Sequence, residues 1–170
     1  MAEWKIQDPL LGLQAIAETS TTKKVPLGTI VKAVHQSSTG STTYGSGEFI
    51  YLLGVVSTTV GTWVTYNADD FSTTRLAANA IGPVAVAMSA NVASQYGWYQ
   101  ISGKAIGLAV SISDNDRVYA TATAGSVDET VVDGDMVHLA KAASAQDSPS
   151  TGFAEFEIHR PYMDDIAGND

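Results

Sequence analysis

Residues 96–105 read YGWYQISGKA, which places three aromatic side chains within four positions of one another. In a β-strand successive side chains point to opposite faces, so Tyr96 and Trp98 share one face while Tyr99 and Ile101 share the other. The rings therefore cannot form one flat binding platform. We expect a strand that packs on both faces, one toward a core and the other toward a second sheet or a neighbouring subunit.

Alternation of apolar and polar residues continues on both sides of this stretch. It is clear near the C-terminus, where Phe156 and Ile158 alternate with charged neighbours, as in an antiparallel sheet with one wet face. Gly97 and Gly103 would allow bends or bulges. Strands are expected near residues 30–34, 48–56, 60–66, 84–88, 96–102, 104–112, 117–123, 135–140 and 153–160. About nine short strands with Gly-, Asp- and Ser-rich turns predict a mainly β fold, an antiparallel β-barrel or β-sandwich.

The length of 170 residues suits one domain. We expect an N-terminal arm or linker over residues 1–24, a β-rich body over residues 25–162, and a C-terminal tail over residues 163–170. Residues 38–47, STGSTTYGSG, are polar and glycine-rich, so they predict an exposed loop.

Within the arm, Asp8 followed by Pro9 is a pair typical of a helix N-terminus. Gly12 weakens a helix at this point. A short helix and an extended arm are both compatible with the sequence.

Charge is concentrated in the last part of the chain. Residues 105–170 contain twelve acidic and three basic residues. The net charge of this segment, −9, equals the net charge of the whole chain. Such a surface repels phosphate, so we expect no nucleic-acid partner. The N-terminus lacks the pattern of a signal peptide, and no apolar run approaches the roughly 20 residues of a membrane helix. We therefore expect no membrane partner and synthesis in the cytoplasm of the producing cell.

Few residues of the sequence are candidates for catalysis or metal binding. Cysteine is absent, which excludes disulfides and thiolate metal sites. His35, His138 and His159 each stand alone on an expected strand, without the spacing of metal ligands, and we expect them in surface or turn positions. No serine has the context of a nucleophile elbow. We expect neither catalytic residues nor a cofactor.

Acidic residues cluster in SDNDR at 113–117 and VVDGDMV at 131–137. Neither cluster has the full spacing of a calcium loop. Asp133 and Gly134 instead predict a two-residue hairpin with a type I′ turn, and a weak divalent-ion site is the alternative.

Several longer stretches carry a family resemblance. They are PLGTIVKAV (26–34), GEFIYLLGV (47–55), VGTWVTYN (60–67), AIGPVAVAMSANVASQYGWYQISGKA (80–105) and VYATATAGSVDETVVDGD (118–135). In order, and over about two-thirds of the chain, they resemble tailed-phage capsid decoration (cement) proteins.

The resemblance implies a β-barrel or β-tulip-like body that binds the outside of an icosahedral shell, often as a homotrimer, and catalyses nothing. The partners it implies are the major capsid protein and other copies of the chain. The location it implies is the capsid exterior of the virion, after synthesis in the bacterial host.

We expect the arm to reach onto the capsid or a neighbouring subunit through apolar residues that bury little within the body. Residues expected to make such contacts are Trp4, Ile6, Leu10 and Leu11 on the arm, and Tyr96 and Trp98 on the body. The alternative is a head-fibre or adhesin-type module that recognises host-surface glycans through Trp63, Trp98 and the loop at 38–47.

Overall fold

All regular structure in the described chain is β-strand. The computed structural model describes residues 3–7, 13–36 and 42–166. The strands are β1 (Glu3–Ile6), β2 (Thr19–Ser20), β3 (Ile30–Gln36), β4 (Thr42–Leu53), β5 (Trp63–Tyr66), β6 (Thr73–Arg75), β7 (Gly82–Ala87), β8 (Tyr96–Ser111), β9 (Arg117–Ala120), β10 (Val127–Asp128), β11 (Met136–Ala142) and β12 (Phe153–Met163). The prediction of a mainly β fold is confirmed.

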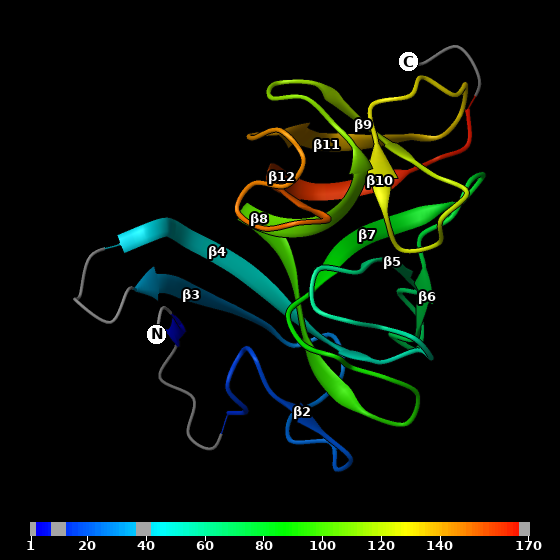
Figure 1. The fold of residues 1–170 in the computed structure, drawn as a ribbon. Coiled ribbons are helices and arrows are strands. Elements are labelled where there is room, and N and C mark those ends of the chain that lie inside the picture. Colours follow the sequence, from blue (N-terminus) through cyan, green and yellow to red (C-terminus); the bar gives the residue numbers. More distant parts are fainter. Residues whose placement is uncertain (1–2, 8–12, 37–41, 167–170) are drawn as a thin grey trace.

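Strand β8 connects the two halves of the molecule (Figure 1). Its first half pairs with β2 and β4 and, through Tyr99 and Gln100, with β7; residues 102–108 pair with β12, and the end of the strand pairs with β10. Strands β8, β10, β9, β11, β12 and β7 follow one another around a closed six-stranded barrel. The barrel prediction is confirmed, and the two strands expected at 96–102 and 104–112 are one continuous strand.

The strand bends where it passes from the N-terminal sheet into the barrel. Gly103 has φ +97°, and a Cβ at this position would collide with the carbonyl oxygen of Ser46. The side-chain Nε2 of Gln100 donates hydrogen bonds to the carbonyl oxygens of Ser102 (3.1 Å) and Lys104 (3.2 Å). The bend thus requires a glycine, and a side-chain amide satisfies the carbonyl groups on both sides of it.

Three apolar cores lie along β8. The leader core contains Ile16, Val31, Ala33, Phe49, Tyr51 and Trp98. The middle core contains Ile50, Leu52, Val64, Ala85, Ala87, Tyr99 and Ile101. The barrel core contains sixteen buried residues, among them Trp63, Val84, Val86, Ala105, Ala109, Phe156 and Ile158. Between residues 97 and 101 both faces of β8 are therefore buried by the chain itself, whereas along 105–109 buried and half-exposed residues alternate.

The same alternation in the neighbouring strands makes the cores successive layers. On β4, Tyr51 faces the leader core and Leu52 the middle core. On β5, Trp63 faces the barrel core and Val64 the middle core. On β12, Phe156 and its apolar neighbours face the barrel interior, as the sequence predicts, while Glu157 and His159 are exposed.

Two local predictions are wrong. Residues 42–47 belong to β4 and pair with β3, so this part of the stretch 38–47 is a strand, and residues 37–41 lie outside the described residues. Asp133 and Gly134 do form a turn, in which the N–H of Asp135 donates to the carbonyl of Val132 at 3.0 Å. Only Gly134 of the two has positive φ, which excludes type I′. The flanking strands β10 and β11 each pair with β9, so the turn does not close a hairpin.

The C-terminal boundary also shifts. Met163, expected to begin a tail, is the last residue of β12 and is buried in the barrel core. Asp164 lies with one carboxylate oxygen 3.3 Å from Nε2 of His138.

We expect Trp98→Ala to lower the free energy of unfolding by about 3–5 kcal/mol, because it removes a fully buried indole and leaves a cavity in the leader core. Denaturant unfolding followed by circular dichroism measures the change. The control is Val56→Ala, at a side chain that is 62% exposed, with an expected change within about 0.5 kcal/mol. Equal stability of the two variants would contradict the burial of Trp98.

Candidate interaction surface

The first described residues of the arm are part of the sheet. Strand β1 pairs antiparallel with β3, with Trp4 opposite His35 and Ile6 opposite Ala33. Both Trp4 and Ile6 are half-buried against the leader core. The indole of Trp4 meets the rings of Phe49 and His35 edge-on, at centroid distances of 4.9 Å and 5.0 Å. Leu10 and Leu11 lie outside the described residues, as do Asp8 and Pro9.

Gln14 fastens the arm to the body. Its Nε2 donates to the carbonyl of Tyr96 at 3.0 Å, and its Oε1 accepts from the hydroxyl of Tyr51 at 2.9 Å. The backbone carbonyl of Gln14 accepts from the indole N–H of Trp98 at 2.8 Å. Ile16 fills the leader core beside these groups, with 1% of its surface exposed. Residues 13–16 therefore complete a core of the body.

These contacts correct the expected division at residue 24. The described residues before Val25 supply strands β1 and β2 to the sheet and pack Trp4, Ile6, Leu13 and Ile16 on the leader core. The expectation that the arm buries little within the body is therefore wrong. Trp98 is 0% exposed and has no surface for a contact with a second protein. Tyr96 is half-buried and stacks on Tyr51 at a centroid distance of 6.4 Å.

The two tryptophans proposed to recognise glycans, Trp63 and Trp98, are not available at the surface. Trp63 and Trp98 are both fully buried, so neither ring presents a face for sugar stacking. Trp63 packs edge-on against Phe156 within the barrel core, at a centroid distance of 4.9 Å.

The histidines have three different environments. His35 lies between Trp4 and Tyr44, where burial lowers its pKa, so the expected surface position is wrong. His138 is half-buried and stacks on Tyr162 at 4.9 Å. His159 is exposed. In the part of the chain that the structure describes, no three His, Asp or Glu side chains are grouped to hold a metal ion.

Within the first acidic cluster, Asp116 interacts with Glu129. The pKa of Asp116 is raised by a hydrogen bond with the Glu129 carboxylate. The pKa of Glu129 is lowered by hydrogen bonds from Ser113, whose N–H lies 2.6 Å from Oε2. The pair shares hydrogen bonds in a loop region of the barrel.

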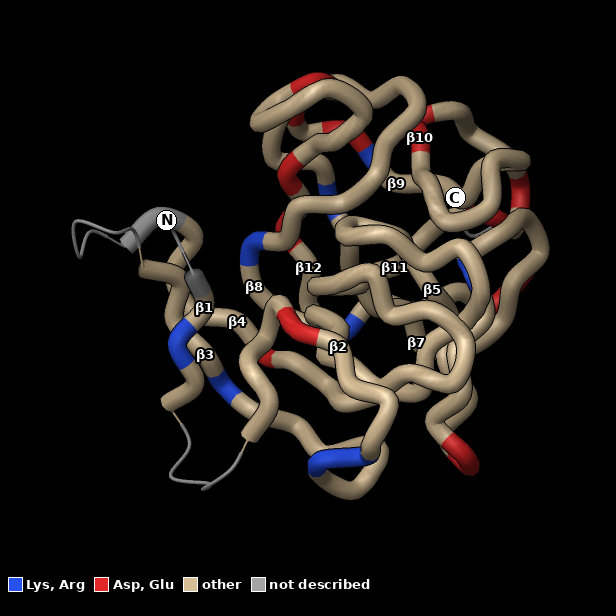
Figure 2. The backbone as a smooth tube through the Cα atoms, turned by 60° about the horizontal axis from the view of Figure 1, so that its bottom comes forward, with Lys and Arg blue, Asp and Glu red and all other residues tan. Residues whose placement is uncertain are grey.

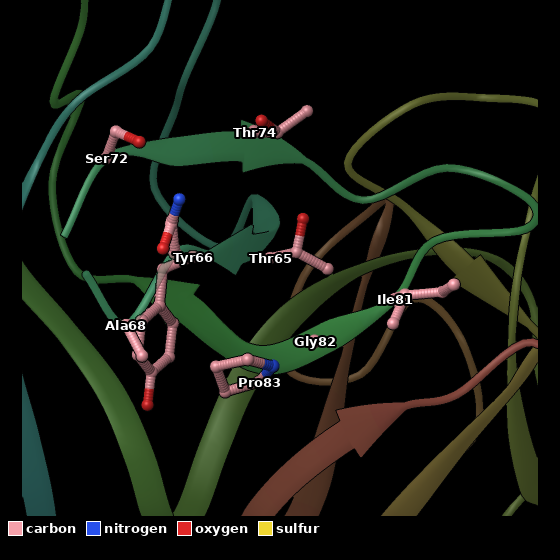
Figure 3. Close-up of a pocket in the computed structure, with 9 residues that line it drawn as sticks. Thr65, Tyr66, Ala68, Ser72, Thr74, Ile81, Gly82 and Pro83 are labelled. Carbon is pink, nitrogen blue, oxygen red and sulfur yellow. The ribbon is translucent and has the colours of Figure 1, made fainter. Parts of the chain in front are cut away.

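A shallow groove of about 410 Å³ lies over the outer face of β5 (Figure 3). Figure 3 shows Thr65 at its centre, between Thr74 of β6 and Pro83 of β7. The other lining residues are Tyr66, Asn67, Ala68, Ser72, Ile81 and Gly82. Burial raises the pKa of the Tyr66 hydroxyl. The lining offers hydroxyl, amide and apolar groups without a carboxylate, an imidazole or an amine.

Charge is distributed unevenly over the surface (Figure 2). Acidic residues are frequent around β9, β10 and β11, and lysines lie along β1, β3 and the segment that precedes β3. We call the latter region the lysine face; it consists of Lys5, Lys23, Lys24 and Lys32, all with exposed side chains. Acidic residues also occur in this region, where the ammonium of Lys32 lies 4.0 Å from a carboxylate oxygen of Glu48. The two regions thus differ in their predominant charge.

Comparison with protein-family models, with curated proteins and with solved structures finds no match to this chain. The resemblance to decoration proteins therefore stays a prediction. Among the described residues, no helix is long and apolar enough to cross a membrane.

We expect Gln14→Ala to lower the free energy of unfolding by roughly 1–3 kcal/mol, because it leaves the hydroxyl of Tyr51 without its acceptor inside the protein. Thermal or denaturant unfolding measures the loss. Gln7→Ala makes the same chemical change at an exposed side chain and should alter stability by less than about 0.5 kcal/mol. A Gln14→Ala protein as stable as the wild type would mean that the arm is not fastened to the body.

Proposed function

We propose that the chain is a structural virion protein that binds the exterior of a phage capsid and stabilises the expanded shell. In this proposal its partners are the major capsid protein and further copies of itself, and it catalyses no reaction. The proposal starts from the resemblance of the stretches between residues 26 and 135 to decoration proteins.

The observation that carries the proposal is the separation of charge between the lysine face and the acidic barrel. A protein that covers a shell needs one side for the shell and another for solvent. An acidic outer side stays hydrated and repels nucleic acid and neighbouring particles. The lysine face is the side that we propose for docking.

The fastened arm changes the expected mode of docking. Trp4 and Ile6 pack onto the leader core, and lysines occupy the surrounding surface. Docking through this face is then mainly electrostatic and weakens as salt rises. Binding to the assembled shell alone stabilises it by mass action, by about 4 kcal/mol per site at a thousandfold excess over Kd.

The proposed homotrimer rests on the resemblance. Aromatic side chains on both faces of β8 had suggested a subunit interface, but the chain itself buries Trp98 and Tyr99. Sedimentation of the purified protein gives the oligomeric state directly.

We expect the double variant Lys23→Glu, Lys24→Glu to bind expanded capsids roughly 5- to 30-fold more weakly than the wild type, because the loss of exposed charge pairs totals about 1–2 kcal/mol. Cosedimentation with purified capsids that lack this protein measures Kd. The control is Lys141→Glu, an exposed reversal on the barrel strand β11, which should leave Kd unchanged.

Two outcomes would count against the proposal. If the wild-type protein does not bind expanded capsids, the decoration function is wrong. If it binds and the double variant binds equally well, the function stands but docking uses another surface.

A further inference from the structure

The groove over β5 is an uncharged region on a strongly charged protein. The chain has nine basic and eighteen acidic residues, yet none of the described residues that line the groove is among them. Its volume of about 410 Å³ lies within the range of ligand-binding pockets, roughly 300–1,000 Å³. A ligand in the groove therefore meets neutral polar and apolar side chains.

The two walls of the groove differ in chemistry (Figure 3). Ser72 and Thr74 lie on one side. Thr65 is directly opposite Thr74 in the pairing of β5 with β6, so these two side chains share one face of the sheet. Ile81 and Pro83 lie on the other side, and Ile81 is 70% exposed. The groove therefore has a wall of hydroxyl groups and a wall of apolar groups.

Two local hydrogen bonds determine what the polar side of the lining offers to a ligand. The side-chain Oδ1 of Asn67 accepts from the N–H of Asp69 at 2.8 Å, so the amide is oriented and its Nδ2 group is left as a donor. The hydroxyl of Ser72 donates to Oδ1 of Asp70 at 2.7 Å, so its oxygen is left as an acceptor. The threonine hydroxyls can act in either sense, so the lining combines donors and acceptors.

The position of the groove excludes a peptide that adds a strand to the sheet. Such a peptide needs a row of unpaired backbone groups at a sheet edge. Strand β5 lies between β6 and β7 and pairs with both, so its backbone is engaged on both sides. A ligand over β5 is therefore recognised by side chains.

A saccharide matches this combination of walls. A pyranose ring has hydroxyl groups around its edge, each of which both donates and accepts, and it has C–H groups on its faces. An ionic ligand would find no opposite charge in the lining, and a purely apolar ligand would cover the hydroxyl wall without replacing the hydrogen bonds to water.

We propose that the groove over β5 binds a neutral saccharide, with one pyranose ring across Thr65, its hydroxyl groups toward Ser72 and Thr74, and its C–H groups on Ile81 and Pro83. The site uses neither of the buried tryptophans, and it is independent of capsid binding. It adds a binding activity to the proposed structural role.

Saturation-transfer NMR with the methyl glycosides of glucose, galactose, mannose and N-acetylglucosamine tests the proposal, because these neutral probes differ in the orientation or substitution of their hydroxyl groups. At least one of them should receive saturation from the wild-type protein, and a titration gives its Kd. The matching uronide carries a carboxylate in place of the hydroxymethyl group. It should bind more weakly by about threefold or more, because the lining has no cation and the protein has a net charge of −9.

Two substitutions locate the binding. Thr65→Val and Thr74→Val each remove one hydroxyl group from the groove and keep a β-branched side chain that suits a strand. Each should raise Kd about three- to tenfold, the contribution of one neutral hydrogen bond. Thr151 is exposed in the turn before β12 and does not line the groove, so Thr151→Val is the matched control and should leave Kd unchanged. Circular dichroism checks that each variant is folded.

The proposal is overturned if none of the four glycosides receives saturation from the wild-type protein, or if the uronide binds as tightly as the neutral glycoside. It is also overturned if neither groove variant binds more weakly than Thr151→Val, because the saccharide would then occupy another site. Cosedimentation with capsids is a separate measurement, so its outcome bears on the proposed function alone.

Discussion

The fold depends on how β8 leaves one sheet and enters the barrel. Residues 102–104 at the bend are half-buried, so their carbonyl groups need partners within the protein where water does not reach them. Gly103 supplies the backbone conformation, and the amide of Gln100 supplies donors to the carbonyls of Ser102 and Lys104. The three cores lie along this one strand, so a change in its backbone conformation at the bend would disturb the packing of all three.

The burial of β8 also determines what is left for binding. Trp63 and Trp98 fill cores, and the surface keeps a region rich in lysines, a region rich in acids and a hydroxyl-lined groove over β5. The arm acts as a cover for the leader core, and its exterior carries part of the lysine face. A body with the arm packed onto it and with an uneven distribution of charge suits the proposed role on a shell better than an apolar arm that stands away from the body.

The sequence predicts the fold class and the two faces of the central stretch, because side-chain alternation is a local property of a strand. The contacts that it does not predict join distant residues. Nothing near Gln14 indicates that it reaches Tyr51 and Trp98, and the burial of His35 depends on Trp4 from another strand. The two-residue strands β2 and β10 are too short to produce a pattern. For the candidate sites, sequence reasoning found the charge asymmetry but not the groove over β5, whose lining comes from β5, β6, β7 and the segments between them.

The central claim is that the arm and β8 form one cooperative unit, and native-state hydrogen exchange of the Trp98 indole N–H tests it most directly. This proton is donated to the carbonyl of Gln14, so it becomes free to exchange only when the arm leaves the body. If the account is right, its exchange requires the same free energy as the most protected backbone amides of β8 and falls with denaturant in parallel with them. Rapid exchange of the indole proton while the amides of β8 stay protected would contradict it, because the arm would then open alone.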